Sequence, residues 1–70
     1  MVDKRPFIRQ LIRLREEKGD RPRYFQINYI DGSSTNKNKW NEDSLEEVLG
    51  VGILSVLFWF NNFELKIDVI

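Results

Sequence analysis

Residues 53–70 read ILSVLFWF-NN-FELKIDVI, with an apolar run on each side of Asn61 and Asn62. Both runs are rich in β-branched and aromatic residues, which favour strands. Asn tolerates the positive φ that a two-residue hairpin turn requires, so the pair of Asn residues is suited to joining the runs. The stretch therefore predicts a C-terminal β-hairpin made of residues 53–60 and 63–70.

The two-residue turn also sets the register of this hairpin. Position 60 then faces 63, 58 faces 65, 56 faces 67 and 54 faces 69. We expect the wholly apolar face to form the core, and its residues are Leu54, Val56, Phe58, Phe60, Phe63, Leu65, Ile67 and Val69. The opposite face carries Ile53, Ser55, Leu57 and Trp59 beside Glu64, Lys66, Asp68 and Ile70. Because residues 63–70 alternate cleanly, we expect them at an edge of the sheet and residues 53–60 at its centre.

The N-terminal segment has the spacing of an amphipathic helix. A helix collects its apolar residues in one stripe, whereas a strand would divide them between two faces; they are Phe7, Ile8, Leu11, Ile12 and Leu14. Pro6 suits a first turn, Lys18 suits a last turn, and Gly19 stands where helices commonly close with a left-handed residue. The pattern predicts a helix near residues 5–18, whose polar side carries Arg5, Arg9 and Arg13.

The middle of the chain begins with a predicted strand over residues 23–30. Its apolar face is formed by the alternating residues Phe25, Ile27 and Tyr29. Asp31 and Gly32 then give a strong signal for a hairpin or loop. The polar residues 33–39 fit either a loop or a short edge strand that ends at Trp40, and both interpretations stay open.

A second, shorter helix is predicted to follow. Ser44 and Glu47 have the spacing of a capping box, in which each side chain bonds the free backbone amide of the other residue. Apolar residues follow at helical spacing, namely Leu45, Val48 and Leu49. We expect a short helix over residues 44–49 that ends at Gly50.

Together these segments predict a single α+β domain over residues 1–70. An N-terminal helix and a short second helix would pack on a mostly antiparallel sheet of three or four strands that ends in a C-terminal β-hairpin. A core of this size rarely supplies more than about 3–5 kcal/mol of net stability. Because the chain has no Cys, disulfides cannot add to this stability. We therefore expect association with a second copy of the chain or with another protein.

The composition excludes most catalytic mechanisms that small enzymes use. The chain has 70 residues with no Cys and no His, so it offers no thiolate nucleophile, imidazole base or ordinary zinc site. The cluster of carboxylates complements the dipole at the start of the second helix, which explains it more simply than a metal would; it comprises Glu42, Asp43, Glu46 and Glu47. We therefore expect no catalytic, metal or cofactor site, and a protein that is not an enzyme.

The zero net charge conceals a division along the chain. Residues 1–23 carry eight basic and four acidic side chains, a net charge of +4, whereas residues 24–70 carry three basic and seven acidic ones, a net charge of −4. The first residues lack the apolar run of a secretory signal. The longest apolar run, residues 51–60, is half of the roughly 20 residues that a bilayer span needs. We expect a cytoplasmic protein without membrane contact.

Two predicted surfaces carry residues that the formation of the fold alone does not explain. The first is the ridge of Arg5, Arg9 and Arg13, which has three open interpretations: a solvated or internally paired face, a contact for an acidic protein, and a contact for nucleic acid. The second is the sheet face of Ile53, Leu57 and Trp59. If both helices pack on the other face, this surface is open to a partner or a second copy; otherwise the first helix covers it.

The leading hypothesis is a small non-enzymatic regulator or inhibitor that binds a larger protein and occludes it. No catalytic set is present, and both surfaces offer contacts; the partner-binding residues are then Arg5, Arg9, Arg13, Ile53, Leu57 and Trp59. A homodimer through the Trp59 face is a further expectation. Compact antagonists of this type are common among the products of viruses and mobile elements, an origin that is compatible with this chain.

The alternative is an accessory nucleic-acid-binding protein that uses the Arg-rich N-terminal segment. Its cations would neutralise phosphates while an aromatic ring stacks on bases; the residues are Arg9, Arg13, Arg21, Arg23, Tyr24 and Trp40. Such binding falls steeply with salt, because bound phosphates release counterions. The sequence lacks an RNP-type strand, a KH loop and a recognition-helix motif.

Overall fold

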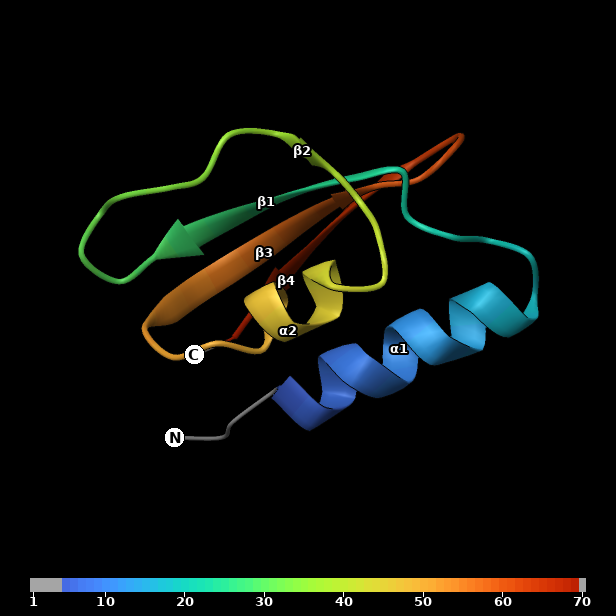
Figure 1. The fold of residues 1–70 in the computed structure, drawn as a ribbon, viewed down its shortest axis with the longest axis horizontal. Helices are drawn as coiled ribbons and strands as arrows, with labels where there is room; N and C mark the ends of the chain where they lie inside the picture. Colours follow the sequence, from blue (N-terminus) through green and yellow to red (C-terminus); the bar gives the residue numbers. More distant parts are fainter. Residues whose placement is uncertain (1–4, 70) are drawn as a thin grey trace.

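The computed structural model describes residues 5–69. Four antiparallel strands form a sheet in the order β2-β1-β3-β4, and two helices accompany it (Figure 1). The predicted α+β fold, with its N-terminal helix, short second helix and C-terminal hairpin, is confirmed. No helix in this part of the chain is long and apolar enough to cross a membrane. The elements are α1 (Arg5–Glu17), β1 (Tyr24–Tyr29), β2 (Asn38–Lys39), α2 (Ser44–Val48), β3 (Ile53–Trp59) and β4 (Glu64–Asp68).

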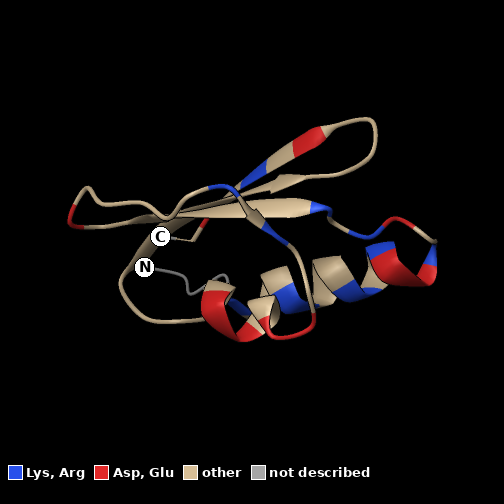
Figure 2. Cartoon of the chain, turned by 45° about the horizontal axis from the view of Figure 1, so that its top comes forward, with Lys and Arg blue, Asp and Glu red and all other residues tan. Residues whose placement is uncertain are grey.

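Both helices lie on the same face of the sheet (Figure 1, Figure 2). Ile8 and Ile12 of α1 and Val48 of α2 are buried in one cluster with Phe25 and Phe58 of the sheet. Burial of these apolar side chains drives the packing of the two layers. Among residues 5–69, no helix lies over the opposite face of the sheet, which we call the open face. This arrangement decides the question that the sequence left open about the Trp59 face.

The β3–β4 hairpin has the predicted register. Val56 pairs with Ile67, and Phe58 pairs with Leu65. Val56, Phe58 and Ile67 are buried, while Leu65 is half-buried. The alternation of apolar and polar residues therefore identifies the core face correctly along the shared length of the two strands.

The turn of this hairpin differs from the prediction. No non-glycine residue in the described part of the chain has positive φ, so the expectation of positive φ at Asn61 and Asn62 is wrong. The hairpin closes instead through the Phe60 N–H, which donates to the Phe63 carbonyl at 2.9 Å. The rings of these two residues stack with their centres 4.5 Å apart. These contacts hold the strand ends together without a turn that demands left-handed residues.

A β-bulge at Leu54 changes the faces at the start of β3. Asn28 of β1 pairs with Ser55 and Tyr29 pairs with Ile53, so Leu54 has no partner on β1. One extra residue inverts the alternation of side chains. Ile53 consequently lies in the core with 2% of its surface exposed, while Leu54 is 46% exposed. The predictions that placed Leu54 in the core and Ile53 on the partner-binding face are therefore wrong.

The predicted turn at Asp31 and Gly32 is confirmed. Gly32 adopts a φ of 92°, a conformation that glycine reaches without a steric penalty. The Asp31 Oδ1 accepts hydrogen bonds from the Ser33 N–H at 2.9 Å and from the Ser33 hydroxyl at 2.6 Å. These bonds stabilise the charged carboxylate and hold the pKa of Asp31 below its ordinary value of 3.8.

The open question about residues 33–40 resolves as a short edge strand. β2 pairs Asn38 with Phe25 and Lys39 with Tyr24. Both β2 residues are exposed, which is typical of a strand that borders solvent. The segment before β2 is a loop, so each of the two interpretations describes one part of this stretch.

Trp40 follows β2 and enters the core. Its N–H donates to the Arg23 carbonyl at 2.9 Å. Its indole ring meets the rings of Phe25 and Phe58 edge to face, with centres 5.5 and 5.7 Å apart. Only 7% of Trp40 is exposed, and such aromatic clusters contribute strongly to core stability. The prediction that Trp40 stacks on bases is therefore wrong.

The capping bonds of α2 lie one turn earlier than predicted. The Ser44 N–H donates to the Asn41 Oδ1 at 3.1 Å, and the Asn41 N–H donates to the Ser44 Oγ at 3.0 Å. Ser44 is itself a helical residue, and the preceding Asp43 makes no side-chain capping bond. The proposed box between Ser44 and Glu47 is wrong, because Asn41 already occupies the Ser44 hydroxyl.

The apolar stripe of α1 is wider than the face that contacts the sheet. Ile8 and Ile12 are buried and Leu11 is half-buried, as expected. Phe7 is 55% exposed and Leu14 is 48% exposed, so the sheet buries only part of the predicted apolar stripe. The two lie on one flank of the stripe, and a single sheet covers only its centre.

The end of α1 agrees with the prediction. Gly19 has a φ of 84°, its N–H donates to the Glu16 carbonyl at 3.0 Å, and the Asp20 N–H donates to the Arg15 carbonyl at 2.8 Å. These two bonds form a Schellman motif. The Arg15 guanidinium also lies 5.3 Å from the centre of the Phe63 ring, so the last turn of α1 contacts the β3–β4 hairpin.

Candidate functional site

An aromatic pair with a single cation above it occupies the open face. Tyr24 of β1 and Trp59 of β3 stand directly opposite each other in the antiparallel ladder. The Lys37 Nζ lies 4.5 Å from the centre of the Trp59 ring and 5.0 Å from the centre of the Tyr24 ring. Both distances are within the range of cation–π attraction. Tyr24 is exposed and Trp59 is half-buried, so solvent reaches the two rings and the ammonium group together.

Sequence reasoning missed Lys37. It lies in the loop between β1 and β2, in a polar stretch without periodicity. The Thr35 N–H donates to the Ile27 carbonyl at 2.9 Å, and the Thr35 hydroxyl accepts from the Ile27 N–H at 2.9 Å. These bonds hold the loop against β1 and bring Lys37 over the rings. No local pattern marks a lysine for this position, because the contact depends on strand pairing.

Polar groups surround this aromatic pair. Leu57, which was predicted to lie here, is half-buried and stands opposite Gln26 on one side and Lys66 on the other. Glu64 stands opposite Trp59. The open face therefore has a small apolar centre with a polar rim, which is the organisation of many protein interfaces.

A basic pocket lies at the β1–β2 end of the sheet. It has a volume of about 350 Å³, and within residues 5–69 its lining has three cations and no carboxylate. Tyr24 belongs both to this pocket and to the aromatic pair, so the two features are continuous. The lining residues are Arg21, Pro22, Arg23, Tyr24, Lys39, Trp40 and Asn41.

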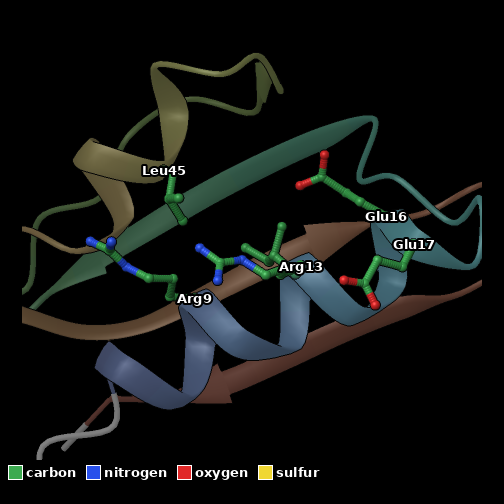
Figure 3. Close-up of a pocket in the computed structure, with 6 residues that line it drawn as sticks. Arg9, Arg13, Glu16, Glu17 and Leu45 are labelled. Atoms are coloured by element: carbon green, nitrogen blue, oxygen red, sulfur yellow. The ribbon is translucent and has the colours of Figure 1, made fainter.

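The predicted arginine ridge lies in the helical layer, away from the open face. Arg9 and Arg13 line a groove of about 410 Å³ between α1 and α2 (Figure 3). Glu16, Glu17 and Leu45 line the same groove. These carboxylates reduce the net positive charge around the ridge. This favours the interpretation of the ridge as a solvated or internally paired face. The third ridge residue, Arg5, is half-buried and lines a smaller neighbouring pocket.

Each of the two predicted sets of site residues is therefore divided between separate surfaces. Of the partner-binding set, Leu57 and Trp59 share the open face, the three arginines lie in the helical layer, and Ile53 is buried. Of the nucleic-acid set, Tyr24 lies with Arg21 and Arg23 in the basic pocket, while Arg9 and Arg13 lie in the groove between the helices.

Within residues 5–69, no group of three or more His, Cys, Asp or Glu side chains could hold a metal ion. The acidic residues of α2 are Glu46 and Glu47, and both are exposed at its first turn. Comparison of the chain with protein-family models, with curated proteins and with solved structures finds no match.

Proposed function

We propose that this protein is a small non-enzymatic regulator or inhibitor that binds a larger protein through its open face and occludes it. The observation that carries the proposal is the group of Tyr24, Lys37 and Trp59 on the open face, over which no helix of the described residues lies. Trp and Tyr are frequent among the residues that dominate binding energy in interfaces. The setting that we propose is the cytosol.

The chemistry of this face favours an acidic partner segment with an apolar side chain. A carboxylate of the partner would meet the Lys37 ammonium, which is already held above the two rings. An apolar side chain would cover Trp59 and Leu57. Arg23 and Lys39 at the adjoining pocket extend the positive potential, which steers acidic partners and raises their rate of association.

The arginine ridge has a secondary role in this proposal. Arg9 and Arg13 share their groove with Glu16 and Glu17, so their attraction for an acidic partner is weaker than that of the open face. A partner large enough to reach around the edge of the sheet would contact both surfaces.

The proposal is tested by affinity capture from lysate with the wild-type chain and two charge-reversal variants. Lys37→Glu is expected to abolish capture of the partner, because it places a carboxylate against an acidic segment. Lys18→Glu makes the same change in charge at an exposed position beyond α1 and is expected to retain the partner. Recovery of nucleic acid with no protein, or equal capture by both variants, would overturn the proposal.

A second candidate function is binding of single-stranded nucleic acid at the basic pocket. The observation that favours it is the convergence of Arg21, Arg23 and Lys39 beside Tyr24 with no carboxylate in the lining. Cations would contact phosphates while the exposed phenol ring stacks on a base, as in other single-strand binders.

Fluorescence anisotropy with single- and double-stranded oligonucleotides at low and moderate salt tests this candidate. Binding is expected to prefer the single strand and to fall steeply with salt. The double variant Arg21→Glu/Arg23→Glu should lose it, whereas Arg9→Glu/Arg13→Glu, in the groove between the helices, should retain most of it. An absence of binding at low salt rejects this function.

A further inference from the structure

The outer edge of β4 has no strand beside it among residues 5–69. In the sheet order, β4 is terminal and pairs with β3 alone. The Phe60 N–H binds the Phe63 carbonyl, and the Val69 N–H binds the Leu54 carbonyl. Alternate residues from Phe63 to Val69 thus direct their backbone groups toward β3. The residues between them direct their N–H and C=O groups to the free edge, and they are Glu64, Lys66 and Asp68.

An apolar margin runs beside this edge in the helical layer. Positions 7, 11 and 14 of α1 form one stripe, and it lies on the flank opposite to Arg9 and Arg13, which face α2. Phe7 and Leu14 are exposed, and Leu11 is half-buried. On β4 and the turn before it, two further side chains of the core face are only half-buried. The β4 margin comprises Phe7, Leu11, Leu14, Phe63 and Leu65.

The middle of the β4 margin can be assigned to one residue of α1 and one residue of β4. α1 runs antiparallel to β4 (Figure 1), and Arg15 lies over the Phe63 ring. Two strand residues span about 6.6 Å, and four helical residues span about 6 Å. Leu11 of α1 therefore lies level with Leu65 of β4. Phe7 and Leu14 lie at similar distances on either side of this level.

We propose that a second copy of this chain pairs with the free edge of β4, antiparallel, about a two-fold axis at Leu65. Leu65 would face its own copy at the axis. Glu64 would face the partner's Lys66, and Lys66 would face the partner's Glu64, so two pairs of opposite charge form by symmetry. The two sheets would join into one, and the flank of α1 would lie beside the same flank of the partner.

Charge and burial select this register over its neighbours. With the axis at Lys66, that ammonium would face its own copy, which is unfavourable for like charges. With the axis at Ile67, opposite charges would also pair. The contact would then be centred on Ile67 and Val69, whose side chains are already buried within a single chain. The axis at Leu65 covers the side chains that remain half-exposed.

In the same arrangement, the apolar flank of α1 faces the apolar flank of the partner's α1. Because Leu11 lies level with Leu65, the axis passes near Leu11, and Phe7 approaches the partner's Leu14 across it. Exposed apolar patches rimmed by polar residues mark interaction sites, and this arrangement brings the apolar flank of α1 against the same flank of the partner. The alternating charges of β4 disfavour the register centred on Lys66, and charged side chains on an edge strand limit indiscriminate pairing.

Light scattering of the full chain across a range of concentrations is the first test. The wild type is expected to have twice the 8.4 kDa mass of one chain. Lys66→Glu and Glu64→Lys each place like charges opposite each other, and each is expected to halve the mass. The exchanged variant Glu64→Lys/Lys66→Glu restores opposite charges and is expected to restore the dimer. Trp59→Ser, on the open face, should leave it intact.

A single cysteine provides the second test, because the chain has none of its own. Opposite residues at a non-hydrogen-bonded position lie about 4.5 Å apart at Cα, which a disulfide can bridge. Leu65→Cys is expected to form a covalent dimer under mild oxidation. Asp68→Cys is the control, since its two copies would be about 20 Å apart.

Three results would overturn the dimer. These are a wild-type chain that is monomeric at every concentration, a dimer that survives Lys66→Glu, and a dimer that Trp59→Ser dissociates. Efficient cross-linking by Asp68→Cys but not by Leu65→Cys would overturn the register. Dissociation by Trp59→Ser would assign the open face to self-association, because Trp59 lies there. The other results concern the β4 edge alone and leave capture of a protein partner by the open face unaffected, so the two proposals fail separately.

Discussion

Asn41 and Ser44 hold the backbone of each other: the Asn41 Oδ1 accepts the Ser44 N–H at 3.1 Å, and the Ser44 Oγ accepts the Asn41 N–H at 3.0 Å. This reciprocal pair joins the end of the β2 segment to α2. It also positions Trp40, the residue before Asn41, whose ring belongs to the core cluster.

We predict that Asn41→Ala lowers the free energy of unfolding by about 0.5–2 kcal/mol, the usual effect of losing a capping side chain. Urea denaturation measures the change. Glu47→Ala is the control, and it is expected to stay within about 0.5 kcal/mol of the wild type because Glu47 is exposed. A loss for Glu47→Ala as large as that for Asn41→Ala would place the capping box between Ser44 and Glu47 instead.

The bulge in β3 predicts opposite behaviour for two adjacent apolar residues. Ile53→Val is expected to lower the free energy of unfolding by about 0.5–1.5 kcal/mol, because Ile53 is buried. Leu54→Val should change it by less than about 0.5 kcal/mol, because Leu54 is exposed. The two variants remove one methylene each and are compared under the same denaturant. The reverse order of effects would contradict the bulge.

The Lys37 ammonium is predicted to shield Trp59. Lys37→Ala should increase quenching of tryptophan fluorescence by acrylamide, because the Trp59 ring loses its cover. Trp40 is buried, so it contributes little to the change in quenching. It should reduce quenching by iodide, which the ammonium attracts. Lys66→Ala, at a residue that stands opposite Leu57, is the matched control. Equal changes in both variants would show that Lys37 does not lie over the ring.

The Asp31 turn predicts a local dependence on pH. NMR titration of the Asp31 carboxyl should give a pKa below 3.8, and Ser33→Ala should raise it by removing the hydroxyl bond. A pKa lowered by folding adds stability above the ordinary value that is lost as pH falls through the folded value. The turn is therefore fully stabilised at neutral pH and weakens only below about pH 4. An unchanged pKa in Ser33→Ala would contradict the role of the hydroxyl.

The parts of the fold that follow from periodicity could be predicted from the sequence. The alternation of β4 and the helical spacing of α1 record which side chains meet the core, so the pairs Val56–Ile67 and Phe58–Leu65 are confirmed. The end of α1 at Gly19 also follows from a local rule. Each of these features depends on residues that are neighbours in the chain or in one hairpin.

The features that could not be predicted depend on more distant contacts. The extra residue at Leu54 is defined by its pairing with β1 and not by its own chemistry. Lys37 reaches Trp59 because the loop is bonded along β1. Ser44 has acceptable partners both three residues before and three residues after it, and the chain path out of β2 favours Asn41.

The extra residue at Leu54 has a consequence for comparing this chain with others of common descent. A bulge of this kind accommodates one residue without a partner, so a chain without Leu54 would still direct Ile53 into the core. A single-residue gap at this point leaves every buried side chain in place. Alignments of distant homologues should therefore allow an insertion or deletion inside β3, where a strand would ordinarily forbid one.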